Sequence, residues 1–130
     1  MFFDDIFFDN KKNNIDLFST KDGLLYGNMF KNEYKPYKNY KPVVINANDD
    51  KSNLLLNIYE LDFAMNDLSL YLDLHPNDMD VYRKFKAYTN DLDMLVKKYE
   101  MQYGPMELCN SDYDSYQWVY SKLPFKGGNL

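Results

Sequence analysis

The sequence predicts an all-α protein built on a long antiparallel two-helix hairpin, with an irregular N-terminal arm and an aromatic C-terminal tail. Two observations predict the hairpin. Apolar residues recur at alternating spacings of four and three residues through two successive stretches of the 130-residue chain, which is the pattern of one apolar helix face. Only the short sequence Leu74-His75-Pro76-Asn77-Asp78 separates the two stretches, and so short a connection makes two helices antiparallel neighbours.

The arm comes first along the chain. Residues 1–50 show no sustained helical or strand period and contain Asp, Asn, Gly and Pro at short intervals, which predicts irregular structure. Within the arm, Tyr34, Tyr37 and Tyr40 recur every three residues, with lysines in the same register. In a polyproline II strand these residues would form adjacent aromatic and basic stripes. Packing of the stripes onto the hairpin and docking to a partner protein are both left open.

The first helix of the hairpin is expected to begin near Ser52, which is a favourable N-cap residue. Its main apolar seam has heptad spacing and consists of Leu54, Ile58, Leu61, Met65, Leu68 and Leu72. A second apolar stripe lies beside the seam and consists of Leu55, Tyr59, Phe63, Leu70 and Leu74. Since one neighbouring helix covers only one side, the second stripe needs another cover, either the arm and the tail or a partner chain.

The second helix is expected to begin at Pro76, because the fixed φ of proline suits the first helical position. Its apolar seam consists of Val81, Phe85, Tyr88, Leu92, Leu95 and Tyr99. Gly104 and Pro105 are expected to end the helix, with Gly104 as the C-cap. The two seams are therefore expected to face each other at a shallow angle.

These boundaries divide the chain into three regions. The arm covers residues 1–50, the hairpin covers residues 51–105, and the tail covers residues 106–130. The tail holds Trp118, the single tryptophan of the sequence. We expect the tail to pack on the hairpin or on a partner.

Composition excludes several classes of function. The formal net charge of −5 argues against general affinity for nucleic acid, which needs a basic face. No apolar run approaches the length of about 18 residues that a membrane span needs, so none is expected. The single cysteine cannot form an intrachain disulfide.

The remaining chemical groups favour binding over catalysis. His75 is the only histidine, whereas a metal site needs several converging ligands. The Glu-x-x-His units of di-metal helical bundles are also missing from the sequence. No catalytic residue, cofactor or metal ligand is therefore expected. Two alternatives stay open: a metal-binding bundle formed by self-association of two hairpins, and a regulatory helical adaptor.

The residues around the predicted turn carry a resemblance to a known family. The stretch Glu60–Phe63, the stretch Asp67–Asp78 and the sequence Tyr103-Gly104-Pro105 resemble the spore coat protein CotJB family. Leu74 stands where the family pattern has Thr. The resemblance covers about residues 54–125.

The arm carries a second, shorter resemblance, over about residues 22–40. The residues Leu24-Leu25-Tyr26-Gly27-Asn28-Met29-Phe30, followed by Tyr34-Lys35-Pro36-Tyr37, are similar to the companion coat protein CotJA. Gly23 stands where that pattern has Ala.

The resemblance implies a non-enzymatic coat component, made in the mother-cell cytoplasm during sporulation and then placed in the spore coat. It implies CotJA-like and CotJC-like coat proteins as partners, the latter being manganese-catalase-like. On this interpretation the chain is a structural and assembly adaptor, with self-association left open. The residues expected to contact partners are Phe30, Tyr34, Tyr37, Tyr59, Phe63, Tyr71, His75, Pro76 and Trp118.

Overall fold

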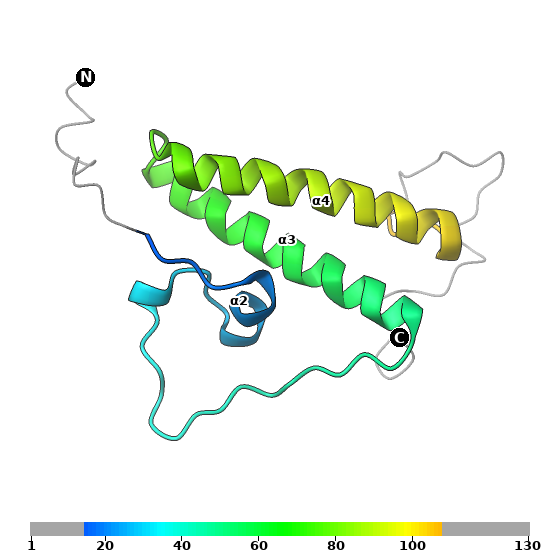
Figure 1. Ribbon diagram of the computed structural model, residues 1–130, viewed down its shortest axis with the longest axis horizontal. Coiled ribbons are helices and arrows are strands. Elements are labelled where there is room, and N and C mark those ends of the chain that lie inside the picture. The colour runs from blue at the N-terminus through cyan, green and yellow to red at the C-terminus, as the bar shows by residue number, and fades with distance from the viewer. Residues whose placement is uncertain (1–14, 108–130) are drawn as a thin grey trace.

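The computed structural model describes residues 15–107, and helices account for most of them. In chain order these are α2 (Thr20–Tyr26), the 3-10 helix η1 (Lys31–Glu33), α3 (Asp50–Leu74) and α4 (Met79–Tyr103). Helices α3 and α4 lie side by side and run antiparallel, while α2 packs against α3 (Figure 1). The predicted all-α hairpin is confirmed. Within residues 15–107, no helix is both long enough and apolar enough to cross a membrane.

Helix α3 begins two residues before the predicted N-cap. Its N-cap is Asp49, whose carboxylate accepts a hydrogen bond from the backbone N–H of Ser52 at 2.7 Å. This hydrogen bond lowers the pKa of Asp49. The prediction of Ser52 as the cap was wrong because Asp49 offers an equally favourable cap side chain three residues earlier, with a charge that suits the positive end of the helix.

Pro76 lies in the connection between the helices and not at the start of α4, so that prediction was also wrong. Helix α4 begins at Met79, with Asp78 as its N-cap. The backbone N–H of Asp78 donates to the carbonyl of His75 at 3.1 Å, which closes a four-residue turn. Pro76 occupies the second position of that turn, where its fixed φ fits as well as it does at a helix start.

The C-terminal end of α4 is formed as predicted. Gly104 is the C-cap, and its N–H donates to the carbonyl of Glu100 at 3.1 Å. Its φ of 104° lies in a region that favours glycine. Pro105 follows and is buried.

The interface between α3 and α4 contains two apolar clusters. The turn-end cluster has a buried centre formed by Met29, Ala64, Leu68 and Val81. The open-end cluster, at the other end of the hairpin, has a buried centre formed by Leu54, Leu55, Ile58 and Tyr99. Both predicted seams contribute to each cluster, directly or through the half-buried residues around it. The turn-end cluster differs in also containing a residue of the arm, Met29.

The arm contains a short helix that the sequence pattern did not predict. Helix α2 begins after Ser19, whose hydroxyl accepts a hydrogen bond from the N–H of Asp22 at 3.2 Å, and it ends at Gly27 with a left-handed φ of 69°. Its seven residues are too few to display a helical period. After η1 the chain runs without a helix through residues 35–49 and bows away from α3 before it enters that helix (Figure 1).

Candidate functional site

The arm is held on α3 by the residue Met29. Its side chain is fully buried in the turn-end cluster with Ala64 and Leu68. Its backbone N–H donates to Oδ2 of Asp67 at 2.8 Å. Hydrogen bonds to an ionised acceptor are stronger than those between neutral groups. Ile15, Leu17 and Phe30 pack against the same cluster, so these contacts together fix the arm to the turn-end part of the hairpin.

Gly23 makes this docking sterically feasible. It is buried on α2, and a Cβ atom at this position would overlap the sulfur of Met29. The absence of a side chain at Gly23 therefore lets the helix approach Met29 closely. This gives a structural reason for the departure from the alanine of the CotJA-like pattern.

Three aromatic rings close the outer side of the arm. The ring of Phe18 lies 5.2 Å from that of Tyr26 and 6.0 Å from that of Tyr34, between centroids, and Tyr26 lies 5.1 Å from Tyr34. These separations are typical of favourable aromatic pairs. Tyr34, which the sequence placed among the partner contacts, therefore packs within the arm itself.

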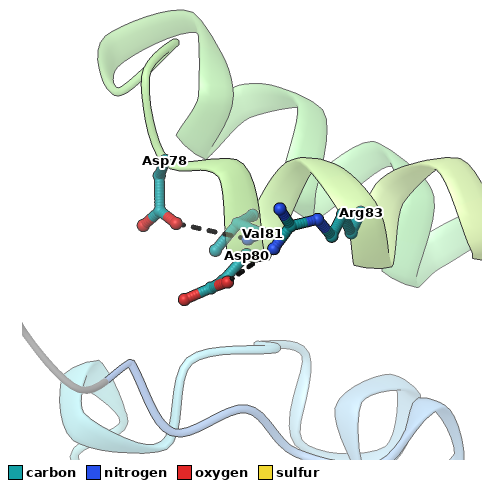
Figure 2. A network of polar contacts seen from close by, with 4 residues as sticks. All are labelled: Asp78, Asp80, Val81 and Arg83. Atoms are coloured by element: carbon teal, nitrogen blue, oxygen red, sulfur yellow. Dashed lines mark hydrogen bonds and ion pairs between the residues drawn. The ribbon is translucent and has the colours of Figure 1, made fainter.

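A group of polar and aromatic residues joins the arm to the turn of the hairpin. The hydroxyl of Tyr71 donates to Oδ2 of Asp78 at 2.8 Å, while Oδ1 of Asp78 accepts from the backbone N–H of Val81 at 3.2 Å. Figure 2 shows the second of these bonds. The ring of Tyr71 stacks on His75 at 4.4 Å and lies 4.9 Å from Phe30 of the arm. Asp78 therefore ties the end of α3 to the start of α4.

The second apolar stripe of α3 is covered only in part. Phe63 packs on the turn-end cluster with the arm, and Tyr59 packs on the open-end cluster. Leu70 and Leu74 are 65% and 67% exposed. Neither α4 nor the arm covers these two leucines.

The remaining predicted contact residues fall into three environments. Tyr37 lies in the part of the arm that connects η1 to α3 and is 85% exposed. Pro76 is exposed in the turn, and His75 beside it is half-buried against Tyr71. Trp118, and with it nearly all of the predicted tail, lies outside the described residues. Met106, the first residue of the predicted tail, is described and packs on the open-end cluster.

The described part of the chain offers little for metal chemistry. Among residues 15–107, no three side chains of His, Cys, Asp or Glu converge in a way that could hold a metal ion. His75 stacks on Tyr71, and the carboxylate of Asp78 accepts hydrogen bonds from Tyr71 and from Val81. The geometry of these residues is that of a structural turn.

Comparison with known families decides what this hairpin is. The family model described as CotJB protein matches residues 52–126, which include almost all of α3, the turn and all of α4. The chain belongs to the CotJB family. It is accordingly a spore-coat-related protein, from a family of coat proteins that is not a known enzyme family. No curated protein and no solved structure gave a significant match.

The structure gives physical roles to the residues of the CotJB-like motif. Asp67 binds the arm, Leu68 fills the core, Tyr71 and His75 stack at the turn, and Asp78 caps α4. The arm with α2 lies outside the residues that match the CotJB family. The motif therefore encodes both the turn of the hairpin and the surface that receives the arm.

Sequence reasoning missed four residues of this CotJB site: Gly23, Met29, Asp67 and Asp78. The signal for Asp78 was available, since an aspartate three residues before the first apolar seam residue, Val81, is a typical N-cap. No local signal marks the partnership of Met29 and Asp67, because 38 positions separate the two residues in the sequence.

Burial makes the tyrosines of the CotJB hairpin hard to ionise. Burial first, and then the hydrogen bond and the negative charge of Asp78, raise the pKa of Tyr71. Burial also raises the pKa of Tyr59 and of Tyr99. At neutral pH these hydroxyl groups therefore stay protonated, which Tyr71 needs in order to donate to Asp78.

These shifts predict that alkaline pH destabilises the hairpin. The stability contributed by the neutral buried tyrosines is complete below the unfolded tyrosine pKa of about 10. Above it, the unfolded chain releases protons that the folded chain retains, so stability is lost as pH rises through the raised values. We expect the free energy of unfolding, from urea titrations between about pH 8 and about pH 11, to fall. The fall should be shallower in Tyr71→Phe and unchanged in Tyr37→Phe; a flat profile in the unmodified chain would contradict the prediction.

Proposed function

We propose that this CotJB-family chain is a non-enzymatic structural and assembly adaptor of the spore coat, which binds other coat components through the exposed end of its hairpin. The observation that carries the proposal is the apolar character of that end. Four large apolar side chains near the turn are left in solvent: Leu70, Leu74, Met79 and Tyr82. Groups of exposed apolar side chains mark binding surfaces more often than single ones do. We call these four residues the turn-end surface.

The charge of α3 indicates the kind of partner that fits the turn-end surface. Residues 54–74 contain four acidic residues and no lysine or arginine. Two of the acids, Asp62 and Asp73, are exposed. A partner surface that combines apolar side chains with lysine or arginine at its edge would complement this helix, since complementary charge directs association and orientation.

The family points to specific partner classes for this surface. A manganese-catalase-like coat protein of the CotJC type is the proposed partner of the turn-end surface. A CotJA-like protein is the second proposed partner. What supports the latter is the position of the CotJA-like segment of this chain, which lies on α3 through Met29 and Asp67. A catalase activity would then reside in the partner, and this chain would position it.

Two aspartate substitutions on the turn-end surface test the proposal. In Leu70→Asp/Leu74→Asp, both changed side chains are exposed, so the fold should persist. Binding to a purified catalase-like coat partner should weaken at least tenfold, because placing two charges in an apolar interface is unfavourable by more than about 1.4 kcal/mol. Affinity can be measured by calorimetry, with co-purification from sporulating cells as the first screen.

A matched control is available on α4. Met94 and Met101 are also highly exposed, and both lie far from the turn. The variant Met94→Asp/Met101→Asp introduces the same two charges and should leave binding unchanged. Equal loss in both variants would indicate a general effect of charge, and no loss in the turn-end variant would refute the assignment of this surface.

A further inference from the structure

We propose that the docked part of the arm, residues 15–34 and called the arm from here on, is exchanged between two copies of this chain, so that Met29 of each copy docks on α3 of the other. The inference goes beyond the proposed coat function and does not depend on any coat partner. It rests on three observations: the arm is closed by its own contacts, its docking site on the hairpin is present on every copy, and the connection to α3 is long.

The arm holds its shape through contacts within itself. The backbone N–H of Phe18 donates to the carbonyl of Met29 at 2.8 Å, and that of Lys31 donates to the carbonyl of Asp16 at 3.1 Å. Leu17 and Phe30 form an isolated antiparallel bridge at the same place. Helix α2 lies within the loop that these bonds close, and the rings of Phe18, Tyr26 and Tyr34 pack against one another. The arm can therefore leave α3 and dock again as a unit.

The docking site combines apolar packing with polar contacts. Ile15, Leu17 and Phe30 of the arm pack against the turn-end cluster, and the ring of Phe30 lies 4.9 Å from that of Tyr71. Met29 contributes its buried side chain and one hydrogen bond to Asp67. Residues of α2, of α3 and of the connection also line one small hollow, namely Lys21, Leu24, Leu25, Ile45, Leu56 and Glu60. Burial raises the pKa of Glu60, and the charge of Lys21 opposes that rise. These groups recognise the shape and charge of an arm, and they are equally complementary to the arm of a second copy.

The connection between the arm and α3 is long enough for the arm to dock either on its own hairpin or on that of a second copy. Residues 35–49 form a segment of 15 residues without a helix, which can span roughly 50 Å when extended. Docking within one chain requires much less: Asp67 lies 17 residues along α3 from its first residue, Asp50, or roughly 26 Å of helix. Val43 and Val44 in the connection are strongly exposed. The segment is therefore long enough to reach a neighbouring hairpin.

Concentration decides between the two arrangements. A flexible connection of this length gives an effective concentration in the millimolar range for docking within the chain. Dilute protein is therefore monomeric, whereas a close-packed protein assembly reaches concentrations at which a second copy competes. Reciprocal exchange satisfies both docking sites and gives a closed twofold dimer. The chain thereby has a means of self-association that operates only when it is crowded.

Isotope-coded cross-linking of the full chain tests the exchange. Unlabelled and 15N-labelled protein are mixed, incubated at about 1 µM or about 1 mM, and treated with a carbodiimide that joins amines to carboxylates without a spacer. Peptides joined through Lys21 and Glu60 are then analysed by mass spectrometry. Docking within a chain gives pairs of one isotope, whereas exchange gives mixed pairs. We expect mixed pairs to increase at least tenfold between the two concentrations.

Controls separate exchange from other association. The dilute sample shows that the reagent joins Lys21 to Glu60 within one chain. Asp67→Lys should abolish mixed pairs, and cross-links from Lys97, which lies far from the arm on α4, should stay within one isotope. Pairs of a single isotope at millimolar concentration would overturn the proposal, and so would mixed pairs that persist in Asp67→Lys.

A shortened connection provides an independent measurement. Deletion of residues 39–46 leaves seven connecting residues, which span roughly 25 Å at most and strain docking within one chain. We expect this variant to sediment as a dimer, whereas a chain with the same residues replaced by glycine and serine stays monomeric. A shortened chain that remains monomeric would contradict arm exchange without affecting the proposed coat function, which the turn-end variants test separately.

Discussion

Replacing Asp78 with alanine is expected to lower the free energy of unfolding by about 2 to 4 kcal/mol. Its two carboxylate oxygens have different partners, the N–H of Val81 and the hydroxyl of Tyr71. Loss of an N-cap removes about 1 kcal/mol, and loss of a hydrogen bond to a charged group removes about 1.5 to 3 kcal/mol. Urea denaturation followed by helical circular dichroism measures the change.

The neighbouring Asp80 provides a matched control. It lies in the same turn of α4 and forms an ion pair with Arg83 at 3.2 Å, as Figure 2 shows beside the Asp78 cap. Both partners of this ion pair are highly exposed, and exposed ion pairs contribute little to stability. Asp80→Ala should therefore have a much smaller effect than Asp78→Ala. Equal effects in the two variants would show that Asp78 acts only as one more negative charge at the helix start.

A double-mutant cycle isolates the bond between Tyr71 and Asp78. Tyr71→Phe removes the hydroxyl and keeps the ring that stacks on His75 and Phe30. Asp78→Asn keeps an acceptor for the N–H of Val81 but removes the charge. If the two residues interact as the structure shows, the double variant should be less destabilised than the sum of the single variants. Strict additivity would contradict the interaction.

The hairpin could be predicted from the sequence because the buried face of a long helix produces a regular apolar spacing over many residues. Leu68, Val81 and Tyr99 were each placed on the apolar seams, and each is buried. The helix boundaries were less accurate. Both errors, at Ser52 and Pro76, arose where two residues within a few positions of each other suit the same local role, and the choice between them depends on which hydrogen bond the folded chain makes.

The candidate site was predictable only in part. The motif drew attention to Tyr71 and His75, which do meet at the turn. The docking of the arm could not be predicted from pattern, because α2 is shorter than any reliable period and its anchor depends on contact between Met29 and Asp67. A surface created by residues far apart in sequence leaves no periodic trace in either segment.

Helix α3 is the organising element of the molecule, since it has three different surroundings. One side packs on α4 and a second side receives the arm (Figure 1). A third part of the helix remains exposed at Leu70 and Leu74. The arm therefore supplies part of the cover that the second apolar stripe requires. The part left uncovered is the one available to another protein.

Replacing Leu68 with alanine is expected to lower the free energy of unfolding by about 3 to 5 kcal/mol. Leu68 is fully buried in the turn-end cluster, with Met29 of the arm, Ala64 of α3 and Val81 of α4. Truncation removes apolar contact and leaves a cavity that backbone from three elements cannot readily fill. Urea denaturation measures the effect, and Leu70→Ala is the control, since Leu70 is exposed on the same helix.

The same substitution distinguishes a docked arm from an independent one. If the arm and the hairpin share one core, Leu68→Ala should also weaken the docking of Met29, and cross-linking of Lys21 to Glu60 in dilute protein should fall. Met29→Ala should then destabilise the Leu68→Ala variant less than it destabilises the unmodified chain, because residues in contact have non-additive effects. Additive effects, or a Leu68→Ala variant no weaker than Leu70→Ala, would mean that the arm rests on α3 without contributing to its core.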